Sequence, residues 1–269
     1  MHLIKSLGRS IPAFFKDEGF YLSASISFFL ILALVPLSLL IITLFGYLMG
    51  ENQDIYQFTL SGLVRLFPAV TEGITTELKN VIIYKGISIL MLVIYGLISL
   101  QLFYSMEHAM NVIFKIPKKR HFLISVFLSV LTVTLVIIFL LLSFTVSSVS
   151  AVFKQYDMSI LGLKIGYDAG ILLKYIAPFM LVLMTFMAIY VIIPRVKVSW
   201  RNAFAGALFV TVLWELAKYF FTLYVKDIIS IGTIYGSLTT FILFLLWVFY
   251  SSCIFLFGAE FVSNLEGRV

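Results

Sequence analysis

Residues 236–261 read GSLTTFILFLLWVFYSSCIFLFGAEF, with Glu260 as their single charged side chain. A run of this kind matches the hydrocarbon core of a bilayer, which takes about 20 helical residues to cross at roughly 1.5 Å per residue. Similar apolar runs recur along the chain, so contact with lipid decides the fold. These runs occupy residues 22–49, 86–108, 122–149, 171–193 and 202–224.

The composition supports the same class. The chain is 62% hydrophobic and 12% charged, with a mean hydropathy of +1.10, whereas a soluble domain is roughly 45–50% apolar and about 25% charged. A soluble fold of 269 residues could not bury so much apolar surface. We therefore predict an all-α polytopic membrane protein, a bundle of about six transmembrane helices that forms a single transmembrane domain over residues 1–269.

Two further stretches show apolar residues at helical spacing. In residues 1–20 basic side chains occupy the other faces, which predicts a short amphipathic helix on the membrane interface, with a polybasic lead-in as the alternative. The long connection 50–85 predicts surface helices in the first external loop. The N-terminal apolar positions are Ile4, Leu7, Ile11, Phe14 and Phe15, and the basic ones are Lys5, Arg9 and Lys16.

Lysine and arginine indicate the orientation. They are concentrated in two short loops on the same side as the N-terminus, KIPKKR at 115–120 and PRVKVSWR at 194–201. Short basic loops stay in the cytoplasm, so both chain ends are expected there. The net charge of +6 is therefore assigned to topology, and no nucleic-acid partner is expected.

The run 202–224 carries one polar stripe. Thr211, Glu215, Lys218 and Thr222 are spaced four, three and four residues apart, so they share one face of an apolar helix. A lone charge near the bilayer centre costs roughly 2.5–3.5 kcal/mol, so these side chains should face the bundle interior or a wet cavity. The stripe fits a substrate pathway for a headgroup or ion. It fits equally a structural ion pair that fixes helix register.

Two prolines fall inside apolar runs. Pro36 is near the middle of the first run and Pro178 is in the outer part of the fourth. If the chain consists of two three-helix halves of opposite topology, these helices correspond, and matching interrupted helices indicate a midplane binding site. Both prolines are therefore included in the substrate-pathway hypothesis, with an ordinary packing kink as the alternative.

Charged residues also gather at the predicted cytoplasmic end of the helices. They are compatible with a salt-bridged inner gate or with ordinary anchoring at the interface, where charges reach water. This predicted cytoplasmic charged cluster consists of Glu107, His108, Arg120, Arg195, Arg201 and Glu260.

Motifs for common enzymatic chemistry are missing from the sequence. It has no glycine-rich phosphate loop and no HExxH, and His2, His108 and His121 do not stand in metal-ligand spacing. We therefore expect no catalytic residues, no metal and no cofactor. Because Cys253 is the single cysteine, an intramolecular disulfide is excluded.

Several stretches resemble the YihY/BrkB family, whose members were long labelled ribonuclease BN. These are SASISFFLILALVPLSLLIITLFG (residues 23–46), MEHAMNVIFKI (106–116) and the final third, in which Gly236-Ser237-Leu238 and Gly258-Ala259-Glu260 match recurring GSL and GAE motifs. Phe28-Phe29 departs from the more usual Tyr-Tyr or Ala-Tyr. The resemblance implies a six-helix protein of the cytoplasmic membrane of a prokaryote and favours the handling of lipid-like molecules.

Three functional hypotheses follow. The first is a transporter or flippase of an anionic, amphiphilic envelope molecule, with membrane lipids as partners. The second is a non-transporting scaffold for envelope proteins, and the third is the ribonuclease of the older family label, which the missing metal ligands disfavour. Homo-oligomers are compatible with each hypothesis.

Overall fold

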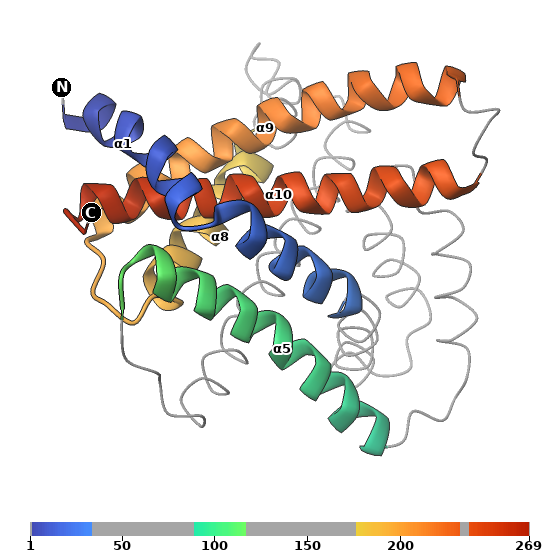
Figure 1. Cartoon of the computed structure of the whole chain (residues 1–269), viewed down its shortest axis with the longest axis horizontal. Helices are drawn as coiled ribbons and strands as arrows, with labels where there is room; N and C mark the ends of the chain where they lie inside the picture. Colours follow the sequence, from blue (N-terminus) through green and yellow to red (C-terminus); the bar gives the residue numbers. More distant parts are fainter. Residues whose placement is uncertain (1, 34–88, 117–175, 232–236, 269) are drawn as a thin grey trace, which may run out of the picture.

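The computed structural model describes residues 2–33, 89–116, 176–231 and 237–268. Within these ranges all regular secondary structure is α-helical apart from one π-helical residue, Ile176, which confirms the predicted all-α class. The helices are α1 (His2–Lys16), the helix Gly19–Ala33, α5 (Ile89–Ile113), α8 (Ala177–Ile192), α9 (Trp200–Ile231) and α10 (Ser237–Leu265) (Figure 1).

The observed helices follow the predicted apolar runs, with one clear difference in length. Helix α9 continues to Ile231, beyond the predicted end at residue 224. The reason is local, because residues 225–231 contain neither glycine nor proline and the first helix breaker is Gly232. The predicted run 122–149, the surface helices of 50–85, and both Pro36 and Arg120 lie outside the described residues.

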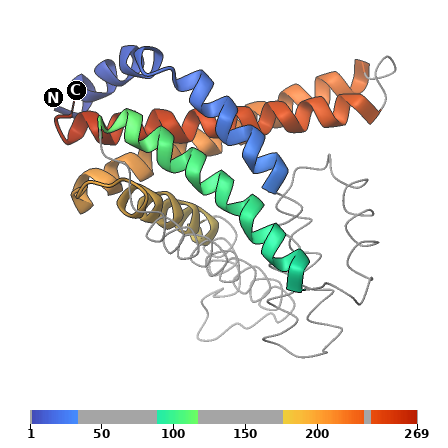
Figure 2. The same ribbon diagram turned by 60° about the horizontal axis from the view of Figure 1, so that its bottom comes forward.

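Helix α10 is the central element of the described bundle. Helices α1, α5, α8 and α9 all contact it, and α8 also packs along α9. Figures 1 and 2 show both chain ends at the same end of α10, where α1 lies against its C-terminal turns. That shared end of the bundle is hereafter called the terminal end.

Small residues bring α9 and α10 close together. A Cβ atom added to Gly258 would lie 1.9 Å from Val210 Cγ2, and one added to Gly206 would lie 2.1 Å from Val262 Cγ2. Ala203 is fully buried on the same face of α9. Close approach through small residues is the usual way in which membrane helices gain packing contacts.

Two described helices are long and apolar enough to cross a membrane, namely Trp200–Val225 and Phe241–Leu265. Large apolar side chains spaced three or four residues apart are exposed along α9, which leaves one face of this helix for lipid. They are Leu208, Val212, Leu216, Tyr219 and Leu223.

The N-terminal segment is a helix, so the alternative of an unstructured polybasic lead-in is wrong. Its position also differs from that of a helix lying only on the interface. Ser10 and Phe14 are buried, whereas Ile11 and Phe15 are 51% and 62% exposed. One face of α1 thus joins the bundle against α10, and an apolar face remains for the membrane interface.

Candidate functional site

Glu215 and Lys218 form an ion pair within α9. The Lys218 ammonium donates to Glu215 Oε1 at 2.6 Å, and the two side chains are 41% (Glu215) and 43% (Lys218) exposed. Because both partners belong to one helix, this contact does not itself set packing between helices. Pairing also reduces the cost of holding two charges on an apolar helix.

The two threonines of the predicted stripe have different surroundings. Thr211 is fully buried, and its hydroxyl donates to the Ala207 carbonyl at 2.7 Å. Thr222 is exposed and donates to the Lys218 carbonyl at 2.8 Å. The stripe is therefore buried at Thr211 and exposed at Thr222, and the ion pair lies between these two positions.

Pro178 lies in the first turn of α8, which begins at Ala177. A proline is well tolerated there, because the first N–H groups of a helix have no acceptor within it.

At the terminal end, a buried ion pair connects α5 with the segment between α8 and α9. Arg195 donates to Glu107 Oε1 from Nε at 2.8 Å and approaches it from Nη2 at 2.7 Å. The Glu107 side chain is only 2% exposed and that of Arg195 is 14% exposed. Of the predicted cytoplasmic charged cluster, the structure brings these two residues together, whereas His108 and Arg201 are exposed.

A second contact joins the start of α9 to the end of α10. Glu266 Oε1 accepts hydrogen bonds from the Ser199 N–H and from Asn202 Nδ2, both at 2.8 Å. Partial burial acts to raise the pKa of Glu266. The hydrogen bonds from Ser199 and Asn202, together with the charge of Arg268, outweigh burial and hold this pKa below its ordinary value of 4.5.

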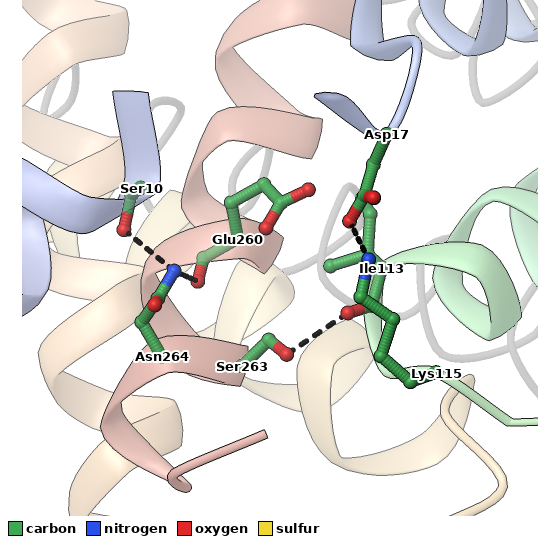
Figure 3. A network of polar contacts seen from close by, with 7 residues as sticks. All are labelled: Ser10, Asp17, Ile113, Lys115, Glu260, Ser263 and Asn264. Carbon is green, nitrogen blue, oxygen red and sulfur yellow. Dashed lines mark hydrogen bonds and ion pairs between the residues drawn. The ribbon is translucent and has the colours of Figure 1, made fainter. Parts of the chain in front are cut away.

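Glu260 belongs to a third arrangement, shown in Figure 3, which joins α1, α5 and α10. Lys115 forms an ion pair with Asp17, whose side chain is 8% exposed. Ser263 Oγ donates to the Ile113 carbonyl at 3.0 Å. Asn264 Nδ2 donates to Ser10 Oγ at 3.2 Å and to the Glu260 carbonyl at 2.9 Å.

Most of these groups line a cavity of about 40 Å³, hereafter called the Glu260 cavity, together with the basic residues Lys16 and Arg268. Glu260 is 2% exposed and its Oε1 has no hydrogen-bond partner, and the same is true of Oδ1 of Asn264, which is 7% exposed. The sequence identified Glu260, but not Asp17, Lys115 or Asn264. One sequence feature could have identified Asp17: the acidic pair Asp17-Glu18 precedes Gly19 and marks the end of α1.

Among the residues that the structure describes, no group of three or more histidine, cysteine, aspartate or glutamate side chains is arranged to hold a metal ion. The chemistry offered by the described part of the chain consists of ion pairs, buried hydroxyls and unpaired acceptor oxygens.

The helices and the lipid-facing side of α9 define an α-helical membrane protein. The chain belongs to the Virulence factor BrkB family, whose model matches residues 11–269. This confirms the resemblance to the YihY/BrkB proteins noted from the sequence.

Relatives are named UPF0761 membrane proteins. The chain is 30% identical to one from Rhodospirillum centenum over 95% of its own length, and 27% identical to one from Legionella pneumophila over 93%. It spans only 56% and 59% of those two relatives. One from Coxiella burnetii is 29% identical, with 93% of this chain and 89% of the relative aligned. No solved structure matches the chain.

Proposed function

We propose that this BrkB-family protein moves an anionic amphiphile, a lipid-like envelope molecule, between the leaflets of a prokaryotic cytoplasmic membrane. About six spans would carry it, with both ends in the cytoplasm. The observation that carries the proposal is the half-exposed pair of Glu215 and Lys218 on a helix whose neighbouring face is apolar and open. Such charges in a membrane segment point to a pathway for charged groups.

The pair is suited to a transient partner. Its exposed fractions, 41% for Glu215 and 43% for Lys218, leave the ammonium accessible to an incoming phosphate or carboxylate. A headgroup could replace Glu215 as the acceptor, and Glu215 would take Lys218 back after release. In such an exchange the Lys218 ammonium passes from one anionic partner to another. It is therefore never left as an isolated charge in an apolar region.

An aromatic groove lies at the same level of α9. It has a volume of about 370 Å³ and is lined by α9 and α10 residues, which include Phe220, Tyr224 and Trp247. This volume falls within the range of small-molecule sites, roughly 300–1,000 Å³, and the apolar lining suits a hydrocarbon tail. An anionic amphiphile requires a partner for its charge and an apolar surface for its tail, and α9 contributes to both, although Glu215 and Lys218 are not among the residues that line the groove.

The test uses the purified full chain in liposomes that contain a fluorescent anionic phospholipid. Label that crosses between leaflets is measured for wild type, Glu215→Gln, Lys218→Met and empty liposomes. We expect protein-dependent movement that falls at least severalfold in both variants. Lys197→Met, a charge removal at an exposed position outside the pathway, serves as the matched control and should leave the rate unchanged.

Three results would change this proposal. Movement at wild-type rate in both pathway variants would remove the pair from the pathway. Absence of movement, together with capture of a stoichiometric membrane partner, would favour the scaffold. RNA cleavage by pure protein that stops when metal is chelated would favour the nuclease, whereas the proposal expects no such cleavage.

A further inference from the structure

The aromatic groove between α9 and α10 lies within the two membrane-length segments of the described structure. All of its lining residues fall inside Trp200–Val225 or Phe241–Leu265, and none of them is charged. Most are aromatic, namely Phe220, Phe221, Tyr224, Trp247 and Tyr250. A ligand of this groove therefore comes from the hydrocarbon region of the bilayer and needs no opposite charge at the lining.

The packing of α9 against α10 shows in which direction the groove runs. The two helices are antiparallel, because a Cβ atom added to Gly206 would meet Val262, while Phe221 contacts Trp247 with ring centroids 4.8 Å apart. Val262 belongs to the turns of α10 at the terminal end. The groove therefore lies farther along both helices, toward the opposite side of the membrane.

The two ends of the groove differ in character. In the same antiparallel register Ile254 lies level with Trp214, and it gives one end of the groove an apolar side chain. At the other end Tyr224 is exposed, one residue before the membrane-length segment ends. Tyrosine is enriched at the boundary between membrane and water. The groove thus runs from this boundary into the hydrocarbon core over roughly 15 Å, at about 1.5 Å per residue, which is the course of one lipid chain.

One wall of the groove is fixed by its own packing. The Trp247 ring lies between Phe221, which is buried, and Trp214, whose ring centroid is 5.6 Å away at an interplanar angle of 66°. Phe220 and Tyr250 are exposed and form the rim. A wall that is in place before the ligand arrives loses little conformational entropy on binding.

Ala217 is the one small side chain among the lining residues. The others are aromatic, apart from Ile254. Because a bulky side chain at position 217 would occupy part of the volume of about 370 Å³, this alanine controls the space that remains for a ligand.

We propose that the groove binds one hydrocarbon chain of an amphiphile whose headgroup lies at the membrane surface opposite the terminal end, and that Ala217 determines whether the chain fits. In this arrangement the amphiphile rests before or after its headgroup reaches Glu215 and Lys218. The identity of the amphiphile as an anionic envelope lipid rests on the proposed function. Binding of the chain does not, and because Glu215 and Lys218 do not line the groove, it should be independent of headgroup charge.

Fluorescence of Trp247 measures occupancy. The chain has three tryptophans, so Trp200→Phe with Trp214→Phe leaves Trp247 as the sole emitter. This full-length reporter, in nanodiscs of unbrominated lipid, is titrated with stearate brominated at mid-chain and with its uncharged methyl ester. We expect saturable quenching by both, with affinities less than threefold apart. A second reporter that keeps only Trp200, an exposed residue at the start of α9, should show quenching that rises linearly.

Two substitutions in the Trp247 reporter test the position of the chain. Ala217→Phe adds a ring inside the groove and should weaken binding at least tenfold. Val212→Phe adds a ring on the exposed face of α9 outside the groove, so it should bind as the parent reporter does. If Ala217→Phe does not fold, Phe220→Ala, which removes an exposed part of the rim, should weaken binding severalfold because apolar contact area is lost.

Four results would overturn the site. Linear quenching of Trp247, as at Trp200, would mean contact with bulk lipid only. Unchanged binding in folded Ala217→Phe or in Phe220→Ala would place the chain elsewhere, and binding of stearate without its ester would place the ligand at a charged group. A smaller oligomer in Ala217→Phe, but not in Val212→Phe, would show that a second copy covers the groove. Saturable chain binding without lipid movement between leaflets would contradict the proposed function and leave this site intact.

Discussion

The Arg195 guanidinium contacts a single oxygen of the buried Glu107 carboxylate from two nitrogens, at 2.7 and 2.8 Å. This pair connects α5 with the segment that leads into α9. It brings together two elements that are more than 80 residues apart in sequence. The terminal end of the bundle therefore depends on a buried charge pair that joins two distant segments.

Removing one partner of this pair should destabilise the protein strongly. Arg195→Met removes the Arg195 contacts of the buried Glu107 carboxylate, and breaking a buried pair from one side costs about 3–5 kcal/mol. The double variant Glu107→Leu with Arg195→Met should recover most of the loss, because the carboxylate is removed together with the guanidinium. Thermal unfolding in detergent measures both. Arg201→Met, at an exposed arginine, is the control, and equal loss in single and double variants would contradict the interpretation.

Close packing at Gly258 predicts a second effect. In Gly258→Ala the new methyl group would meet Val210 Cγ2 at 1.9 Å and the Tyr190 hydroxyl oxygen at 2.4 Å. Overpacking of this kind costs about 1–3 kcal/mol. Adding Val210→Ala should restore part of the stability. Gly8→Ala, where nothing lies within 4 Å of the new atom, should leave the melting temperature unchanged or slightly higher, and a loss there as large as at Gly258 would refute the argument.

Glu266 should make stability depend on pH in the acid range. Its pKa in the folded protein is lower than the ordinary value of 4.5. A lowered carboxyl pKa stabilises the folded state above that ordinary value, and the contribution disappears as pH falls through the folded pKa. The difference in melting temperature between wild type and Glu266→Gln should be constant above about pH 5 and shrink toward pH 3. A difference independent of pH would exclude this linkage.

Features that depend on neighbouring residues could be predicted from the sequence. The all-α class followed from apolar runs of membrane length. The spacing of Glu215 and Lys218, three positions apart on one helix, showed that they can pair, and the structure shows that they pair with each other. The extra length of α9 was missed because polar residues 226 and 227 suggested a loop, while no helix breaker occurs before Gly232.

Contacts between distant segments could not be predicted in the same way. Glu260 was identified as one charge among several at the predicted cytoplasmic end, but its neighbours Asp17 and Lys115 come from the turns that follow α1 and α5. Lysines in short loops are accounted for by the positive-inside rule regardless of their contacts. The sequence therefore does not show that Lys115 pairs with Asp17. Partner choice depends on how three helices meet, which apolar periodicity does not determine.

The contact of α1 with the last turns of α10 has a consequence for biosynthesis. Ser10 receives its hydrogen bond from Asn264, so α1 gains this partner only after about 250 further residues have been joined. At about 5–20 residues per second this is an interval of roughly 10–50 s. During that time a nascent chain carries α1 undocked at the membrane surface. A chain that stops before Asn264 lacks this partner for Ser10, so its α1 stays undocked and accessible to proteases.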